Sequence, residues 1–267
     1  MLTRFAPAPT GYLHLGHVVN AIHVWDRARA EGGLVRLRIE DHDRQRSRPE
    51  FEEAIVEDLS WLGFVPDGPL VRQSDREDVY QAALTTLARQ GLVYGCACTR
   101  SELQQVPAGP DGERRYPNTC RERGLPLGKN FGWRVRMDPG VERFDDGLVG
   151  PQAQEPATQC GDLLIRDRLG NWTYQFAVVA DDIDQGITDV IRGRDLLAST
   201  GRQIRLGRLL GRVQPPRFAH HRLVMKSATE KLSKSDGATG VRALRGSGWS
   251  ARDVLAHARA HVPPHSL

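Results

Sequence analysis

The fold is decided by residues 2–17, which read LTRFAPAPTGYLHLGH. Residues 2–8 indicate a strand, and the two prolines and the glycine of residues 7–11 end it. A helical pattern then runs from about Leu15 to Glu31, and Gly32-Gly33 ends it. A strand, a tight turn and a helix in this order are typical of the first unit of a parallel α/β sheet.

The alternation of strands and helices continues on both sides of an interruption. Apolar and basic residues alternate over 34–39, which indicates a strand, and helical patterns cover 49–62 and 75–90. Between 94 and 160 proline, glycine and arginine are frequent, which indicates short strands and loops. Strand and helix patterns resume at 162–165, 172–180, 187–192 and 199–210. We therefore predict an α/β fold of Rossmann type that is split by an insertion.

These patterns divide the chain into four parts. We expect residues 1–94 to form the first half of the α/β domain and residues 95–161 to form the insertion. Residues 162–240 would form the second half of the domain, and residues 241–267 a short C-terminal tail with one helix near 250–261.

Composition narrows the class of protein. Hydrophobic residues make up 39% of the chain and charged residues 26%, which argues against wholesale disorder. No apolar run approaches the roughly 18 residues that span a bilayer, and the first residues lack the pattern of a secretory signal. We expect a cytoplasmic protein without membrane contact. The net charge of +4 is compatible with a polyanionic partner.

The first candidate site is His14-Leu15-Gly16-His17, at the predicted start of the helix. Gly16 has no side chain, so an adenine or a ribose can lie against the backbone. A helix N-terminus offers N–H groups to phosphates. His14 and His17 share a helix face and can both donate to phosphate oxygens. Taken alone, the pattern also fits two surface histidines beside a helix start.

The second candidate site is Lys231-Leu232-Ser233-Lys234-Ser235, which glycine bounds on its C-terminal side. Three of the four lysines of the chain lie within residues 226–234. A cationic loop of this kind can stabilise the charge of a transferring or departing phosphate group. Taken alone, it also fits an exposed basic loop.

The third candidate site consists of cysteines in the insertion. Cys96 and Cys98 are followed by Cys120, and in a cytoplasmic protein such clusters favour metal binding over disulfides. Structural zinc requires four ligands. The spacing leaves the fourth open between Cys160, a histidine and Tyr116.

The order of the first two motifs resembles the HIGH and KMSKS signatures of class I aminoacyl-tRNA synthetases. The opening segment that ends at His17 closely resembles that of glutamyl-tRNA synthetases. So do Leu37-Arg38-Ile39-Glu40-Asp41-His42-Asp43-Arg44 and Val190-Ile191-Arg192-Gly193-Arg194-Asp195-Leu196-Leu197. The resemblance covers about residues 2–240 and identifies the chain as a member of the glutamyl and glutaminyl class I group.

The resemblance implies roles for individual residues. A glutamate pocket would be lined by Arg4, Ala6, Ala8, Glu40, Tyr174 and Arg192. Within it Glu40 would hold the substrate ammonium, and an arginine fork suits the substrate side-chain carboxylate. ATP, with Mg²⁺, would be bound by His14, Gly16, His17 and Lys234. The catalytic charges would come from His14, His17, Lys231 and Lys234.

Three features distinguish members of the group. The cysteine spacing resembles the zinc site of the glutamyl-queuosine tRNA(Asp) synthetases, which implies that Cys96, Cys98, Tyr116 and Cys120 bind one zinc ion. Val178 stands where full glutamyl-tRNA synthetases usually carry asparagine. Only 32 residues follow Ser235, fewer than an anticodon-binding domain needs.

We therefore expect tRNA-independent activation of L-glutamate with ATP, and transfer of glutamate to queuosine at the first anticodon position of tRNA(Asp). We expect a monomer without an anticodon-binding domain. The alternative is a minimal or truncated glutamyl-tRNA synthetase that charges the tRNA 3′ end.

Overall fold

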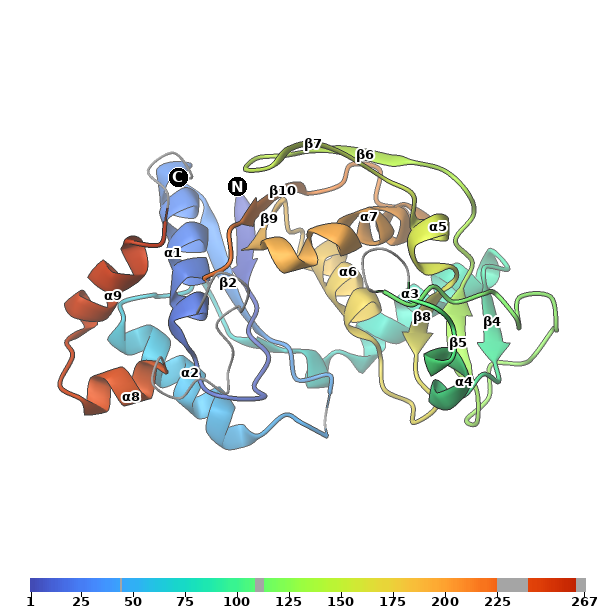
Figure 1. Cartoon of the computed structure of the whole chain (residues 1–267), viewed down its shortest axis with the longest axis horizontal. Helices are drawn as coiled ribbons and strands as arrows, with labels where there is room; N and C mark the ends of the chain where they lie inside the picture. The colour runs from blue at the N-terminus through green and yellow to red at the C-terminus, as the bar shows by residue number, and fades with distance from the viewer. Residues whose placement is uncertain (44, 109–112, 225–239, 263–267) are drawn as a thin grey trace.

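The first part of the chain builds three parallel strands and their helices (Figure 1). The computed structural model describes residues 1–43, 45–108, 113–224 and 240–262. The predicted elements are confirmed, except that the first strand ends at Phe5 and not at Ala8, because Pro7 and Pro9 have no N–H group to donate. The elements are β1 (Leu2–Phe5), α1 (Leu15–Ala30), β2 (Leu34–Ile39), α2 (Pro49–Trp61), β3 (Val71–Arg72), the 3-10 helix η1 (Gln73–Asp75) and α3 (Glu77–Arg89).

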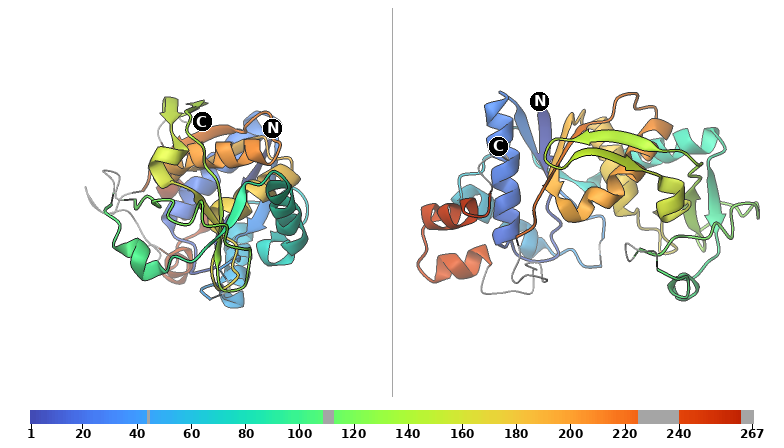
Figure 2. Two further views of the ribbon diagram at one scale, coloured as in Figure 1. Left: turned by 90° about the vertical axis from the view of Figure 1, so that its right-hand side faces the viewer. Right: turned by 45° about the horizontal axis from the view of Figure 1, so that its top comes forward.

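The middle of the chain forms an antiparallel sheet and a separate hairpin. Its elements are β4 (Val93–Cys96), α4 (Arg100–Gln104), β5 (Gly132–Val135), β6 (Glu142–Asp146), β7 (Gly150–Gln154), α5 (Pro156–Cys160) and β8 (Leu163–Arg166). Strand β5 pairs with β4 on one side and with β8 on the other. The β6–β7 hairpin reaches from this part of the molecule back toward the N-terminus (Figures 1 and 2).

The last part of the chain returns to the α/β pattern. Its elements are α6 (Tyr174–Asp184), β9 (Asp189–Gly193), the 3-10 helix η2 (Arg194–Ser199), α7 (Thr200–Leu209), β10 (Arg217–His221), α8 (Val241–Gly246) and α9 (Ala251–Arg259). The predicted strand at 187–192 and the predicted helices at 199–210 and 250–261 are confirmed, whereas α8 was not predicted.

Helices α8 and α9 belong to the folded body of the protein. Val241, Val254 and Ala258 have no exposed surface and lie in the same core cluster as the apolar side of α1. Arg259 of α9 also pairs with Asp26 of α1 at 2.6 Å. The described residues after 240, which the sequence interpretation treated as a tail, therefore pack against the first α/β unit.

The strands of the two outer parts approach one another at β1 and β9. Strands β2 and β3 continue the parallel pairing on one side of β1. Strand β10 pairs in parallel with β9 and, on its other edge, with β6. The Thr188 N–H, just before β9, donates to the Leu2 carbonyl of β1 at 2.9 Å. This arrangement confirms the predicted α/β class with a parallel sheet and brings the β6–β7 hairpin to the edge of β10.

Two large apolar clusters support this arrangement. One contains the buried sides of α1, β1 and β2, and the other contains those of α3, α6 and β8. Within the ranges that the structure describes, no helix is long and apolar enough to cross a membrane.

Candidate active site

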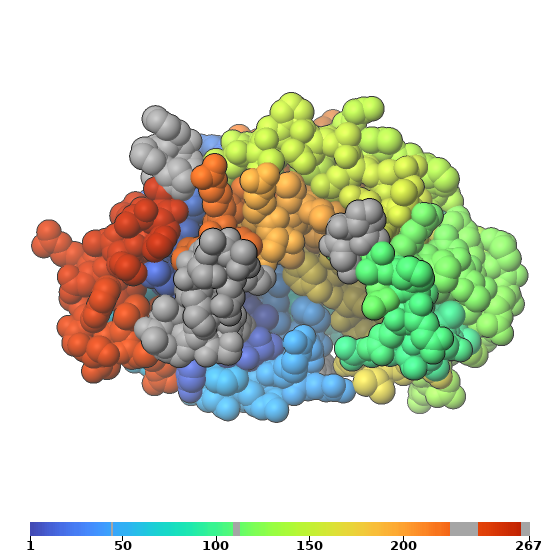
Figure 3. Space-filling view, viewed as in Figure 1, coloured from blue at the N-terminus to red at the C-terminus, as the bar shows by residue number. Residues whose placement is uncertain are grey.

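The residues that the sequence assigned to a substrate pocket line one cavity of about 450 Å³. It lies at the carboxyl ends of β1, β2 and β9, where ligands bind in open α/β sheets. The space-filling view shows a hollow between the light-blue region of α2 and the orange region of α7 (Figure 3). The lining includes Arg4, Ala6, Ala8, His17, Glu40, Tyr174 and Arg192, together with Asn20, His42 and Leu196.

Two buried arginines on one side of the cavity share a carboxylate. Asp182 Oδ1 lies 3.2 Å from Arg4 Nε and 2.8 Å from Arg38 Nη1. Burial opposes the charge of Asp182, but both arginines lower the pKa of its carboxyl group overall. Arg38 has no exposed surface, and although burial opposes its charge, Asp182 and Glu40 raise its pKa. These cations are therefore neutralised within the protein.

Glu40 is a buried acidic residue in the wall of the cavity. Its Oε1 lies 3.4 Å from Arg38 Nη2, and the residue is 7% exposed. Burial raises the pKa of Glu40, while the charges of Arg38 and Arg4 act in the opposite direction. A ligand ammonium beside Glu40 would favour its ionised form, as paired charges do.

Arg192 is buried beside the cavity, and no described carboxylate is in contact with it. Its Nε donates to His220 Nε2 at 2.9 Å, its Nη1 to Gln203 Oε1 at 2.7 Å and its Nη2 to Thr200 Oγ1 at 2.8 Å. Within the described part of the chain, no carboxylate oxygen lies within 4.0 Å of its guanidinium. Burial lowers its pKa and the charge of Arg4 adds to this effect, while Tyr174 and the charge of Asp182 act in the opposite direction. A buried cation with no carboxylate in contact is costly, and an anionic ligand would relieve that cost.

Tyr174 begins α6 at the cavity. Burial raises the pKa of its hydroxyl group, so it stays a neutral phenol. Val178, one turn further along α6, is 1% exposed and lies in the apolar cluster.

The two histidines of the first motif cap α1. The Gly16 N–H donates to His14 Nδ1, and the His14 N–H donates to His17 Nδ1, both at 3.1 Å. Each Nδ1 therefore accepts, which places the proton of each neutral ring on Nε2, a donor suited to phosphate oxygens. The two ring centroids are 3.9 Å apart.

Gly16 takes part in this cap through its backbone. Its N–H is bonded to His14 and is not free for a phosphate. A Cβ on Gly16 would lie 2.9 Å from His14 Cε1, so the glycine is required by the close approach of this imidazole.

The second motif, with Lys231 and Lys234, lies outside the described residues. The described chain after this motif lies against the first motif. Gly240 forms an isolated antiparallel β-bridge with His14, and the Val241 N–H donates to the Leu13 carbonyl at 2.9 Å.

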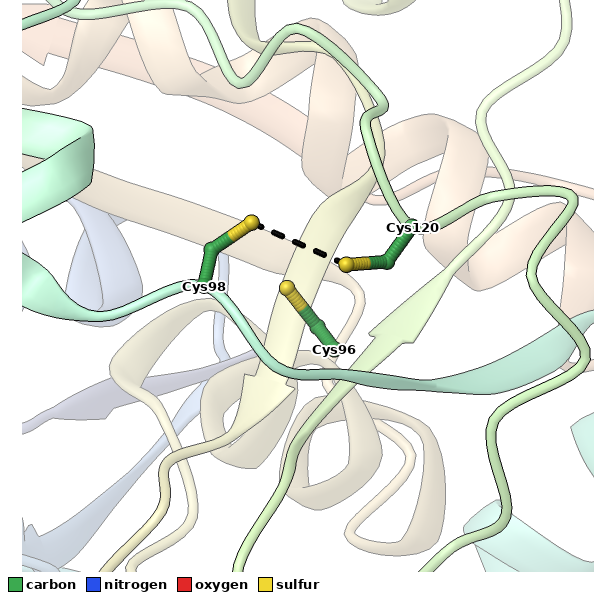
Figure 4. Close-up of side chains that lie close together, drawn as sticks. All are labelled: Cys96, Cys98 and Cys120. Atoms are coloured by element: carbon green, nitrogen blue, oxygen red, sulfur yellow. Dashed lines mark hydrogen bonds between the residues drawn. The ribbon is translucent and has the colours of Figure 1, made fainter.

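Three cysteine thiols of the insertion point toward one another (Figure 4). The Sγ atoms of Cys96, Cys98 and Cys120 all lie within 4.8 Å of one another, a spacing that suits a metal ion. Tyr116 Oη lies 3.3 Å from Cys96 Sγ and accepts the Cys120 N–H at 2.9 Å. Cys160 Sγ is not part of this group and donates to the Pro156 and Gly161 carbonyls.

Cationic groups surround the thiols. Arg134 Nε donates to Cys96 Sγ at 3.3 Å, and its guanidinium lies 3.5 Å above the Tyr116 ring. Burial opposes the thiolate of Cys120, but hydrogen bonds from the Ala97 backbone and neighbouring side chains lower its pKa to about 7. Burial and the neighbouring Cys120 and Cys96 thiols raise the pKa of Cys98 to about 11, so these surroundings favour the thiolate at Cys120 but not at Cys98.

Sequence reasoning missed Arg38, Asp182 and His220. The alternation in β2 indicated that its arginines face solvent, whereas Arg38 is fully buried. An acidic pair in the apolar run of α6 was the available signal for Asp182. On α7, Arg202 and Arg205 form ion pairs with Glu113 and Glu142.

Comparison with known proteins gives consistent matches. Residues 1–255 match the family model of class I tRNA synthetases (E and Q), catalytic domain. A glutamyl-Q tRNA(Asp) synthetase of Bordetella bronchiseptica is 52% identical over 241 residues, which are 88% of this chain and 75% of that protein. One of Rhodobacter capsulatus is 41% identical and covers 95% of this chain and 98% of its own length.

A solved structure also resembles the protein. The glutamate-tRNA synthetase of Elizabethkingia anophelis superimposes with a TM-score of 0.76 at 33% identity and covers 89% of this chain. The chain spans about half of that protein, 53% of its length.

We predict that Asp182→Asn lowers the free energy of unfolding by about 3 kcal/mol at pH 7, because Arg4 and Arg38 lose a shared buried partner. Guanidinium chloride unfolding measures this loss. Because the pKa of Asp182 is lowered in the folded protein, its contribution to the free energy of unfolding is present at pH values above the pKa of an unfolded aspartate, about 4. The contribution is lost as the pH falls through the folded value, so the difference from wild type should narrow in acid.

Asp184→Asn is the matched control on the same helix. Asp184 is half exposed and pairs with Arg76 at 2.6 Å, so its loss should cost less than about 1 kcal/mol. Equal losses in the two variants would contradict the role of Asp182 as the partner of two buried cations.

Proposed function

The chain belongs to the class I tRNA synthetases for glutamate and glutamine (E and Q), a family of ATP-dependent ligases, and from this membership we propose its reaction. It activates L-glutamate with ATP without the help of tRNA. It then transfers the glutamyl group to queuosine at the first anticodon position of tRNA(Asp).

The observation that carries the choice of amino acid is the pairing of charges at the cavity. Arg192 is a buried cation without a carboxylate within 4.0 Å among the described residues. Glu40 is a buried acid on the wall of the same cavity. A ligand with an ammonium and a side-chain carboxylate complements both, and Arg192 offers a fork that matches a carboxylate. This complementarity supports glutamate as the substrate.

Activation requires an oxygen of the glutamate α-carboxylate to attack the α-phosphorus of ATP. The new bond gives glutamyl-adenylate, and the bond to the pyrophosphate leaving group breaks. His14 and His17 would donate Nε2–H to the phosphates, and Lys231 and Lys234 would add positive charge. Mg²⁺ would neutralise phosphate charge when bound with ATP. Positioning and electrostatics carry the step, so it needs no nucleophilic side chain.

The names of the relatives support the nature of the acceptor. The Bordetella and Rhodobacter proteins, which cover most of this chain, are glutamyl-Q tRNA(Asp) synthetases. A hydroxyl of the queuosine cyclopentene ring would attack the glutamyl carbonyl and release AMP. The solved glutamate-tRNA synthetase, at 33% identity, supports the alternative acceptor, the tRNA 3′ end.

We further propose that the insertion binds one structural zinc ion through Cys96, Cys98, Cys120 and Tyr116. Tetrahedral zinc with Zn–S bonds near 2.3 Å separates its sulfur ligands by about 3.8 Å. The Cys98 and Cys120 Sγ atoms are 3.7 Å apart. Tyr116 Oη lies 3.3 Å from Cys96 Sγ, whereas the Cys160 thiol donates to the Pro156 carbonyl. Zinc would fix two loops on the antiparallel sheet.

We predict that labelled glutamate is transferred only to tRNA that contains queuosine. Bulk tRNA from queuosine-containing cells and from queuosine-lacking cells would be tested side by side with the same enzyme and ATP. Labelling of the first pool alone supports the proposed acceptor. Equal labelling of both pools would identify 3′-end charging, and labelling of neither would overturn the transfer reaction.

We predict that Tyr116→Phe weakens zinc binding at least roughly ten-fold, because the ion loses one of four ligands. Cys160→Ser should retain one zinc ion per chain. Competition with a chromophoric chelator measures both. Retention of zinc by the Tyr116 variant together with its loss from the Cys160 variant would assign the fourth ligand to Cys160.

A further inference from the structure

Behind Arg192, two buried side chains form a hydrogen-bonded series that leads away from the cavity. Arg192 Nε donates to His220 Nε2 at 2.9 Å, and His220 Nδ1 lies 2.5 Å from Asp146 Oδ2. Arg192, His220 and Asp146 are 4%, 1% and 3% exposed. They lie on three adjacent strands, β9, β10 and β6.

The chemistry of the donors fixes where the protons lie. An arginine Nε–H can only donate, so His220 Nε2 accepts and the proton of a neutral ring is on Nδ1. The Nδ1–H then donates to Asp146 Oδ2. Burial lowers the pKa of His220, in keeping with a neutral imidazole, even though Asp146 acts in the opposite direction.

Asp146 is itself held by the backbone at the tip of the β6–β7 hairpin. Its Oδ1 accepts the N–H groups of His220, Leu148 and Val149 at 3.0 to 3.1 Å. Burial opposes the charge of Asp146, but hydrogen bonds from the His220 side chain and these N–H groups lower its pKa to about 2. One oxygen thus binds the backbone and the other orients the imidazole.

The consequence is that the arginine is oriented by neutral groups. His220, Gln203, Thr200 and the Leu196 carbonyl all accept hydrogen bonds from Arg192, and none carries a negative charge. The one carboxylate of the series, on Asp146, reaches Arg192 only through the imidazole. The fork is therefore held in place while its charge stays available to a ligand.

We propose that Asp146 and His220 are positioning residues, which set the histidine tautomer that holds Arg192 for the side-chain carboxylate of the substrate. The inference rests on the proposed activation of glutamate. Residues that orient a binding group from behind commonly contribute ten-fold or more to affinity, as they do around metal ligands.

The variant Asp146→Asn tests the role of the His220 tautomer, because asparagine has almost the same size as aspartate. The amide oxygen would take the Oδ1 position, where the three backbone N–H groups need an acceptor. The amide NH₂ would then face His220 Nδ1 and move the ring proton to Nε2, where it opposes the Arg192 Nε–H. In ATP–pyrophosphate exchange, we expect the KM for glutamate to rise roughly ten-fold or more. The KM for ATP should stay within about two-fold.

Two further variants separate positioning from a structural role. Asp145→Asn, an exposed neighbour on β6, should leave both KM values unchanged. His220→Gln retains an acceptor for Arg192 but has no tautomer to set. It should raise the KM for glutamate about three-fold or more, and adding Asp146→Asn to it should have little further effect.

The outcomes distinguish this inference from the proposed function. Absence of glutamate-dependent exchange in wild type would overturn the proposed function. If wild type shows normal exchange, three results would overturn only the positioning role. The first is an unchanged KM for glutamate in Asp146→Asn, and the second is a parallel rise in its KM for ATP. The third is an equal effect of Asp146→Asn on the KM for glutamate in wild type and in His220→Gln. If Asp146→Asn does not fold, His220→Gln decides, because an unchanged KM for glutamate overturns the role.

Discussion

The guanidinium of Arg192 is buried beside the cavity, and in the ranges that the structure describes no carboxylate lies within 4.0 Å of it. The neighbouring cations of Arg4 and Arg38 differ from Arg192 because both form ion pairs with the carboxylate of Asp182. A buried charge without a partner costs free energy. In the proposed function, a substrate carboxylate would remove that cost on binding and so favour an amino acid with an acidic side chain.

The fold explains how so many charges come together in one place. Parallel strands β1, β2 and β9 open at one edge of the sheet and deliver Arg4, Glu40 and Arg192 to the same cavity. The β6–β7 hairpin leaves the insertion to pair with β10, and its tip brings Asp146 to His220. The insertion therefore reaches the neighbourhood of the cavity through Asp146, and it also carries the cluster of three thiols.

The sequence predicted the α/β alternation, because strand and helix patterns are local features, and the resemblance of its motifs to a known family indicated residues that line the cavity. It could not predict the buried arginine of β2, since an alternating strand ordinarily turns its charged residues to solvent. Nor could it predict that Gly16 donates its N–H to His14. Asp146 and His220 are 74 residues apart, and their contact depends on the register between a hairpin and β10. No periodicity in the chain reveals that register.

The decisive measurement is amino-acid selectivity in ATP–pyrophosphate exchange without tRNA, which shows whether Arg192 selects a side-chain carboxylate. Glutamate, glutamine and norvaline would be compared at equal concentration, because they differ mainly in the charge at the end of the side chain. We predict exchange with glutamate and at least roughly a hundred-fold less with the other two, since of the three only glutamate carries a side-chain carboxylate that can pair with the buried charge of Arg192. Comparable exchange with glutamine would contradict it.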